Sequence, residues 1–92
     1  MRQNEYHPEV LSPPGATLLD LLEERVMSQA ELAARIGRPL QTINAIVKGK
    51  AAITPDIAIQ FERLFGVPAS FWNNREAQYR ESVTRRHHER TR

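Results

Sequence analysis

The sequence predicts an all-α domain of five helices, and three observations support this fold class. Apolar side chains recur every three or four residues, which is the spacing that gives a helix one buried stripe. Ser, Thr, Pro and Gly stand where helices begin and end. No stretch alternates apolar and polar residues as a half-buried strand does. We expect residues 15–81 to form the helical domain, after an extended arm over residues 1–14 and before a flexible basic tail over residues 82–92.

The first two helices follow from an apolar stripe and a capping motif. The stripe indicates a helix over about residues 15–26, and it consists of Leu18, Leu19, Leu22 and Val26. Ser28 and Glu31 form a capping box, in which the hydroxyl and the carboxylate each satisfy an amide left free at a helix start. The second helix is therefore predicted over residues 29–36.

Glycines and prolines mark the remaining helices. Gly37 ends the second helix, because glycine tolerates the left-handed conformation of a tight corner. Thr54 and Pro55 form a further start signal, with a capping hydroxyl followed by a proline at the first helical position. The third helix is predicted over residues 39–48, the fourth over residues 55–65 and the fifth over about residues 70–81.

Composition restricts the classes of function that this chain can have. Its 92 residues leave room for one modest core. With 40% hydrophobic residues it is an ordinary globular protein, and no apolar run approaches the roughly 20 residues that cross a bilayer. The first ten residues lack the apolar stretch of a secretory signal, and the absence of cysteine excludes disulfides and thiolate metal sites. A cytoplasmic location is expected by default.

Positive charge is concentrated in two segments of the chain. The net charge is only +2, and residues 1–79 carry eight Lys and Arg against nine Asp and Glu. Four positive side chains nevertheless lie between Arg35 and Lys50 with no acidic residue among them, and the last thirteen residues hold five Arg against two Glu. Local basicity of this kind is typical of a surface that docks on a polyanion.

Residues 29–48 form a candidate helix-turn-helix. Ala33 is small where the second and third predicted helices cross, and Gly37 makes the turn between them. Ile43 and Ile46 anchor the third helix from beneath. The alternative interpretation is that an exposed helix with amide side chains is simply a solvated face. The residue types at these positions favour DNA binding, because motif and context agree.

A helical wheel of the third helix separates a core face from an outward face. Leu40 lies on the core side with the isoleucines, and the outward face carries Gln41, Asn44, Ala45 and Lys48. Gln and Asn amides can bond an adenine edge in two places, at about 1–3 kcal/mol of discrimination per pair. Gln41 and Asn44 are therefore predicted to read bases, and Ala45 is small enough to let the helix enter a major groove.

A second set of residues is predicted to contact phosphates. Arg38, Lys48 and Lys50 stand where phosphates would flank the groove. Gln29 can bond a phosphate beside the free amides at the start of the second helix, and Thr42 is a further positioning candidate.

Five phrases of the sequence carry a resemblance to a known family: HPEV, PPGATL, MSQAELAARIGRP, QTINAIVKGKAAITPD and GVPASFWNN. Over residues 7–80, about four-fifths of the chain, the sequence resembles the lambda-repressor-type (XRE) helix-turn-helix family, and within it the HigA/VapI-type antitoxins. The resemblance implies a lambda-repressor-like five-helix domain that dimerises on palindromic operator DNA. It also implies repression of the operon that encodes the chain and a partner toxin that cuts messenger RNA on the ribosome.

By position, the family's DNA contacts fall on Leu40, Gln41 and Asn44 for bases, and near Gln29, Lys48 and Lys50 for phosphates. Three residues depart from the family pattern. Leu40 replaces a polar residue of many relatives, Arg38 replaces an apolar turn residue, and Pro39 replaces a Ser or Thr cap. For Leu40 two interpretations remain, since its side chain either covers a thymine methyl or packs inward.

The aromatic residues of the fifth helix also have two interpretations. Phe71, Trp72 and Tyr79 form a candidate dimer or partner surface, because aromatic residues dominate many interfaces. An adjacent pair such as Phe71 and Trp72 more often closes a small core. A homodimer is expected because a two-fold axis places two reading helices about 34 Å apart on successive major grooves. The fifth helix and the proline-rich arm are the expected dimer surfaces.

No catalytic, metal or cofactor site is predicted. His7, His87 and His88 lack the three-or-four spacing that points two ligands at one ion. No set of nucleophile, base and orienting residue is present, so an enzyme is not expected. Two alternatives to a repressor remain open: a protein-interaction module that mainly neutralises a toxin, and the DNA-binding N-terminal module of a longer regulator. The Arg-rich tail either adds phosphate affinity or keeps the protein soluble.

Overall fold

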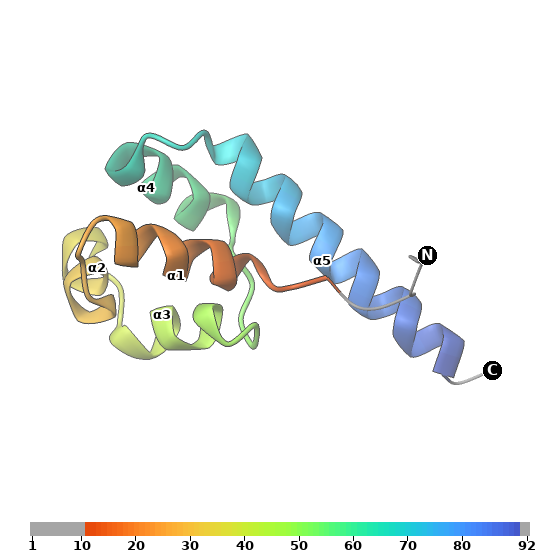
Figure 1. Cartoon of the computed structure of the whole chain (residues 1–92). Coiled ribbons are helices and arrows are strands. Elements are labelled where there is room, and N and C mark those ends of the chain that lie inside the picture. The colour runs from red at the N-terminus through yellow and green to blue at the C-terminus, as the bar shows by residue number, and fades with distance from the viewer. Residues whose placement is uncertain (1–10, 91–92) are drawn as a thin grey trace, which may run out of the picture.

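The computed structural model describes residues 11–90 and confirms an all-α architecture of five helices. They are α1 (Pro14–Glu24), α2 (Gln29–Ile36), α3 (Leu40–Val47), α4 (Pro55–Phe65) and α5 (Ala69–Arg90). The first four helices and the beginning of α5 surround the core, and the second half of α5 projects away from it (Figure 1). Within residues 11–90, no helix is both long enough and apolar enough to span a membrane.

One hydrophobic core joins all five helices. Its buried members are Leu18, Leu22, Leu32, Ala33, Ile43, Ile46, Ile53, Ile57, Ala58, Phe61, Phe65 and Trp72. The Phe61 ring packs edge-on against Trp72 with 5.1 Å between ring centroids. Because α2 and α3 each contribute buried residues to this core, the predicted helix-turn-helix is held rigidly from one side.

The helix boundaries at the turn follow the predicted capping chemistry, with one difference. The Ser28 hydroxyl accepts a hydrogen bond from the Glu31 amide at 3.0 Å, and Gly37 ends α2 in the left-handed conformation with φ 70°. The Glu31 carboxylate bonds Arg35 at 2.9 Å, whereas the capping box placed it on the amide of Ser28. The favourable pairing with an arginine one turn later explains this choice.

Helix α1 is shorter than expected, because Val26 lies outside it. The helix ends at Glu24, and Val26 adopts the left-handed conformation with φ 53° and is 90% exposed. The Met27 amide then donates to the Leu22 carbonyl at 2.9 Å. This bond closes the helix end around a left-handed residue, a position that glycine usually occupies. The prediction of a buried stripe was therefore wrong for Val26, and also for Leu19, which is 36% exposed, while Leu18 and Leu22 are buried.

Helix α5 is longer than expected, since it continues past Glu81 to Arg90. No glycine or proline interrupts this segment, and the Glu81 carboxylate pairs with Arg85 one turn later at 2.6 Å. The expectation of a structureless tail after Glu81 was wrong as far as Arg90, and residues 91–92 lie outside the described part of the chain.

The described end of the arm lies along α5. The Arg75 guanidinium donates to the carbonyl oxygens of Ser12 and Pro13, at 3.3 and 3.2 Å, and to the Thr17 hydroxyl at 3.1 Å. Two turns farther along α5, the Ser82 hydroxyl accepts a hydrogen bond from the Leu11 amide at 3.1 Å. These bonds fix how the chain enters α1. The rest of the predicted arm, His7 included, lies outside the described residues.

Candidate nucleic-acid interface

The reading helix α3 is anchored from behind by two buried isoleucines and by the backbone of α1. Ile43 and Ile46 are 0% and 1% exposed. At Gly15 the backbone of α1 lies directly on α3, where a Cβ atom would come within 2.0 Å of the Ile46 carbonyl oxygen. Only glycine permits this approach, so α3 has little freedom to shift or roll.

The outward side of α3 presents the predicted base-reading residues. Gln41 is exposed, and Asn44 and Ala45, one turn farther along, are half-buried. Leu40 is 42% exposed, whereas the helical wheel placed it on the core side. Because Leu40 is the first residue of α3, it lies at the edge of the packed face and stays outside the core. The inward-packing interpretation of Leu40 is therefore excluded.

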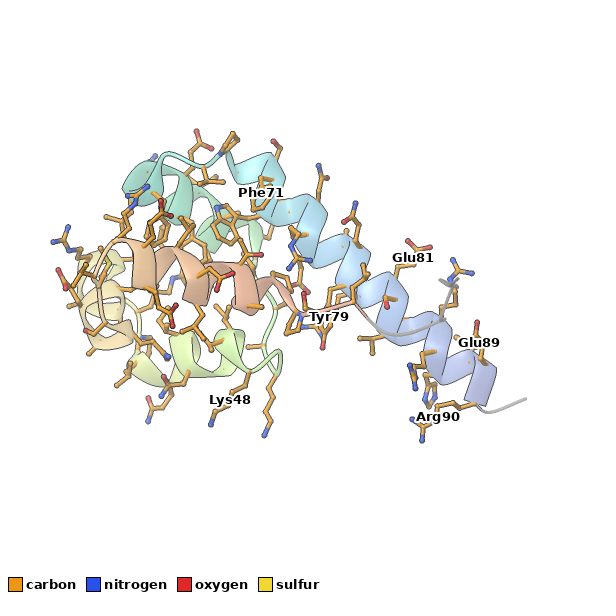
Figure 2. All side chains as sticks on the ribbon, in the orientation of Figure 1. Lys48, Phe71, Tyr79, Glu81, Glu89 and Arg90 are labelled. Atoms are coloured by element: carbon orange, nitrogen blue, oxygen red, sulfur yellow. The ribbon has the colours of Figure 1, made fainter. Side chains whose placement is uncertain are left out.

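A short loop after α3 carries the two predicted phosphate-binding lysines. Lys48 and Lys50 are exposed on either side of Gly49, which has φ 77°. The Lys50 amide donates to the Ala45 carbonyl at 2.8 Å, so the loop is tied to the end of the reading helix. Figure 2 shows the Lys48 side chain extending away from the body of the domain beside α3. Both charges are therefore close to the reading residues.

Gln29 and Thr42, two of the predicted phosphate contacts, lie in the first turns of α2 and α3. Gln29 is the first residue of α2 and is half-buried, and its side-chain oxygen is buried without a hydrogen-bond partner among the described residues. Its amide nitrogen is the atom that can donate to a phosphate. Thr42 is half-buried, and its amide bonds the Pro39 carbonyl at 3.0 Å, which replaces the missing side-chain cap of α3.

Arg38 in the turn is held by a residue that the sequence did not point to. The Arg38 Nε donates to the Gln60 side-chain oxygen at 2.9 Å, and the Gln60 amide nitrogen donates to the Ile36 carbonyl, also at 2.9 Å. A single glutamine of α4 thus fixes both the end of α2 and the arginine after it. Among the described residues, no hydrogen bond engages the two terminal nitrogens of Arg38, so both can donate to a phosphate.

Glu76 is a second positioning residue that the sequence did not reveal. Its carboxylate is buried, accepts a hydrogen bond from the Ile53 amide at 3.0 Å and pairs with the Arg80 Nε at 2.5 Å. Ile53 lies between α3 and α4, so this carboxylate ties the segment after the two lysines to α5. The partners are 23 residues apart, and no local sequence signal marks such a contact.

The candidate aromatic surface on α5 contains only two of its three predicted residues. Trp72 is 0% exposed and lies edge-on to Phe61 and Phe71, so the prediction that it belongs to a partner surface was wrong. Its ring fills the space between α4 and α5, where a large apolar side chain is needed to complete the core. Phe71 is 40% exposed, and Tyr79 is half-buried beneath the guanidinium of Arg80.

Histidine does not form a metal site in the described part of the chain. The rings of His87 and His88 lie 6.2 Å apart on the exposed end of α5, edge to face. No group of three or more metal-ligating residues occurs among residues 11–90.

Comparisons with known proteins agree with this geometry. A helix-turn-helix family model (HTH_3) matches residues 18–72. Antitoxin HigA of Pseudomonas aeruginosa, solved with the higBA promoter, is 30% identical with a TM-score of 0.80, over 86% of this chain and 87% of that chain. PA4674 of the same organism, solved with operator DNA, is 31% identical with a TM-score of 0.79, over 86% and 88% of the two chains.

A third solved structure extends the similarity to another organism. An addiction module antidote protein of the HigA family from Coxiella burnetii is 26% identical with a TM-score of 0.78, over 90% of each chain. Among curated protein sequences none is significantly similar. The family model covers α2, α3 and α4, and the similarity to HigA of Pseudomonas aeruginosa extends over 86% of the chain. The chain therefore belongs to the XRE helix-turn-helix family and, within it, to the HigA-type antitoxins, which are DNA-binding proteins and not enzymes.

Proposed function

We propose that this protein is a dimeric antitoxin that binds a palindromic operator and represses the operon from which it is expressed. The observation that carries the proposal is the exposed Gln41 beside Asn44 on a helix that is fixed from behind. A rigid helix with two outward amides can discriminate bases without rearrangement. The relatives that were solved with promoter or operator DNA support the same use of this face.

In the proposed complex, α3 lies in a major groove. Gln41 and Asn44 bond adenine edges, Ala45 permits close approach, and the exposed Leu40 covers a thymine methyl. The phosphate contacts that set the register come from Gln29, Arg38, Thr42, Lys48 and Lys50.

The small surface that α3 offers to DNA favours a dimer. One α3 of eight residues touches one half-site, whereas a two-fold dimer places two such helices one turn of DNA apart. Phe71 and Tyr79 of α5 are the proposed contribution of this helix to the dimer surface, because they are the aromatic side chains that the core leaves exposed or half-buried.

The test compares two double variants on operator DNA and on a random-sequence duplex. The operator is the palindrome upstream of the chain's own coding sequence. Gln41→Ala with Asn44→Ala should lower the preference for the operator by about 30-fold or more, at about 1–3 kcal/mol per pair, and leave random-sequence binding unchanged. Asn74→Ala with Gln78→Ala removes the same two residue types from the exposed side of α5 and serves as the control.

Fluorescence anisotropy at fixed salt gives both affinities. A double variant at Gln41 and Asn44 that still prefers the operator as strongly as the parent does would show that other residues read the bases.

A second candidate function is neutralisation of a partner toxin, and the exposure of Phe71 favours it. A large apolar side chain that is 40% exposed at the start of a helix is suited to anchor a partner protein. Co-expression with the product of the adjacent gene should yield a complex that Phe71→Ala weakens. Ile59→Ala, which removes a side chain that is 43% exposed on α4, should leave the complex intact. Equal effects of the two variants would contradict a specific role for Phe71.

A further inference from the structure

We propose that Arg75 of α5 is a positioning residue for DNA binding, because it holds the start of α1 against the loop that carries Lys48 and Lys50. This inference rests on the proposed phosphate contacts of the two lysines and names a residue that sets where they lie. Arg75 acts through Pro13, which contacts both the guanidinium and the loop, and not by touching DNA itself.

Arg75 is the main attachment of α5 to the chain that enters α1. Its half-buried guanidinium donates to the carbonyl oxygens of Ser12 and Pro13, at 3.3 and 3.2 Å, and to the Thr17 hydroxyl at 3.1 Å. A further bond joins the Leu11 amide to the Ser82 hydroxyl, at an exposed position where water competes for both groups. Loss of Arg75 would therefore release most of the polar contacts that hold Pro13 in place.

The ring of Pro13 contacts residues 48–50, which we call the lysine loop. A Cβ atom on Gly49 would lie 3.0 Å from the Cβ of Pro13 and 3.2 Å from its Cγ. Gly49 stands between the two lysines and has φ 77°. The backbone of Gly49 thus lies directly on the proline ring, and a movement of Pro13 changes the space that the lysine loop occupies.

The segment between Arg75 and the lysine loop is stiff. Pro13 and Pro14 are consecutive, and each proline ring fixes φ near −65° and restricts the residue before it. Pro13 accordingly has φ −68° and ψ 155°. The next residue, Gly15, is packed on the Ile46 carbonyl of α3. A stiff segment transmits a displacement to its neighbours, so the position of Pro13 is felt at Gly49.

The alternative interpretation is that α3 alone holds the lysine loop and that Arg75 only stabilises the fold. The amides of Lys50 and Ala51 both donate to the Ala45 carbonyl, at 2.8 and 3.2 Å, and the Gly49 amide donates to the Ile46 carbonyl at 3.0 Å. These bonds fix the loop on the side of α3, whereas the contact with Pro13 fixes it on the side of α1. The two interpretations differ in what happens when the lysines are removed.

The test is a double-mutant cycle between Arg75 and the two lysines, with affinity for a random-sequence duplex measured by fluorescence anisotropy. Arg75→Ala should lower that affinity about 10-fold at about 50 mM salt and about 3-fold at about 200 mM, as expected for the loss of one phosphate contact with a salt slope of about 0.9. In a chain that carries Lys48→Gln and Lys50→Gln, Arg75→Ala should have no further effect, since the contacts that it positions are already absent. A merely structural role would lower the affinity by the same factor in both chains.

The duplex is kept to about 10 base pairs, because two reading helices of a dimer need half-sites one DNA turn apart. Arg75 lies one helical turn from Phe71 and from Tyr79, which belong to the proposed dimer surface. Only one chain at a time can place α3 on this short duplex, so a change in dimerisation does not alter the measured affinity.

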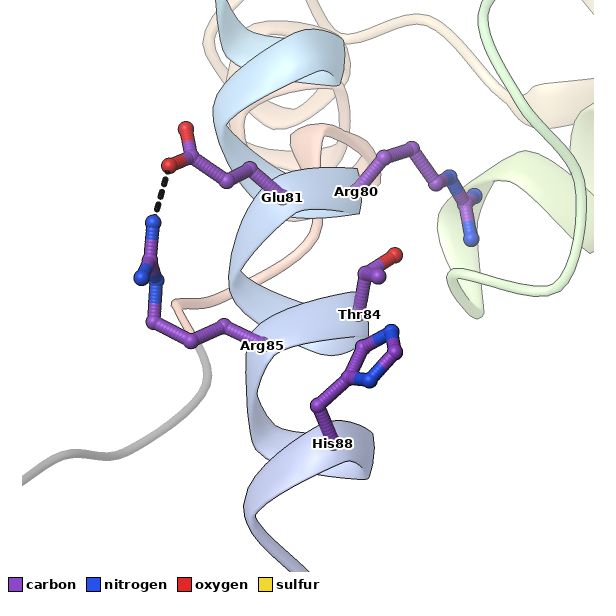
Figure 3. Close-up of a pocket in the computed structure, with 5 residues that line it drawn as sticks. All are labelled: Arg80, Glu81, Thr84, Arg85 and His88. Atoms are coloured by element: carbon purple, nitrogen blue, oxygen red, sulfur yellow. Dashed lines mark hydrogen bonds and ion pairs between the residues drawn. The ribbon is translucent and has the colours of Figure 1, made fainter.

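Two arginines serve as matched controls. Arg85→Ala removes the same charge from α5, where the guanidinium pairs with Glu81 of the same helix at 2.6 Å (Figure 3). Arg25→Ala removes another guanidinium that donates to a distant backbone carbonyl, that of Phe65 at 2.8 Å. Arg25 follows the end of α1, about 15 Å from Gly15 at about 1.5 Å per residue. Both variants should bind the duplex as the parent does.

Pro13→Gly tests the contact with the lysine loop directly. It removes the ring from Gly49 and leaves the carbonyl that accepts from Arg75. It should lower the affinity as much as Arg75→Ala does, and the two substitutions together should lower it no further. Thermal melting followed by circular dichroism shows whether each variant folds, and the cycle is run with Pro13→Gly if Arg75→Ala does not fold.

An equal factor for Arg75→Ala with and without the two lysines would overturn the inference. So would a loss for Arg85→Ala or Arg25→Ala as large as that for Arg75→Ala, or parental affinity of the chain that lacks both lysines. A parent chain that binds the random duplex but does not prefer its operator would contradict the proposed operator function alone, since the cycle would still decide the role of Arg75.

Discussion

Replacing Glu76 by alanine should destabilise the fold through one buried backbone amide. The carboxylate accepts the Ile53 N–H at 3.0 Å inside the protein, and alanine leaves that donor unsatisfied. An orphaned buried donor costs about 1–3 kcal/mol. The pair with Arg80 adds about 0–1 kcal/mol, because the Arg80 side chain is 42% exposed and water screens the interaction. The expected loss is therefore about 1–4 kcal/mol.

Two further variants separate the amide from the ion pair. Glu76→Gln keeps an oxygen that can accept from Ile53 and loses only the charge, so it should cost less than alanine. Arg80→Gln leaves the bond between Glu76 and Ile53 intact and should cost about 0–1 kcal/mol. Urea denaturation followed by circular dichroism gives the three values, provided that the denaturant slope m stays constant. A thermal scan should show the alanine variant melting about 4–8 °C lower per kcal/mol lost.

The losses of stability of the three variants, ranked by size, show whether the amide or the ion pair stabilises the fold. If Arg80→Gln costs as much as Glu76→Ala, the ion pair and not the amide carries the stabilisation. If Glu76→Ala costs less than about 1 kcal/mol, water reaches the Ile53 amide and the carboxylate is not needed to satisfy it.

Three other variants test the packing of α1 on the reading helix, the end of α1 and the anchor of Arg38. Gly15→Ala should lower stability by about 1–3 kcal/mol in urea denaturation, because the added methyl meets the Ile46 carbonyl; parental stability would show that α1 can move away from α3 without cost. Val26→Gly should raise stability by about 1 kcal/mol, since it relieves a left-handed β-branched residue that is 90% exposed; a loss of stability would contradict the strain. Gln60→Ala should weaken DNA binding measured by anisotropy, since it releases Arg38, and parental affinity would show that Arg38 needs no anchor.

Local chemistry made much of the fold predictable. Ser28 caps α2 and Thr54 caps α4, and Gly37 ends α2 in the left-handed conformation, as their positions in the sequence indicated. The apolar spacing of α3 also predicted Ile43 and Ile46 as its buried anchors. These features depend on residues within one or two helical turns, so a single sequence contains the information that determines them.

The errors arose where the deciding contact is distant or where a local rule was broken. A β-branched residue is a poor left-handed helix end, so no local signal indicated that α1 stops before Val26. The extent of α5 was underestimated because its last turns have little apolar content, although ion pairs one turn apart support them. The roles of Gln60 and Glu76 depend on partners more than 20 residues away, which no spacing rule identifies.

The same physical device supports the reading helix at three places. Gln60 of α4 fixes the turn before α3, Glu76 of α5 fixes the segment after it, and Arg75 of α5 fixes the chain that enters α1. Each is a polar side chain that bonds backbone groups of a segment far away in the sequence. Backbone groups offer the same partners whatever side chains the segment carries, so the residues on the reading face can change while these three bonds persist. Specificity for an operator can thus vary on a support that stays constant.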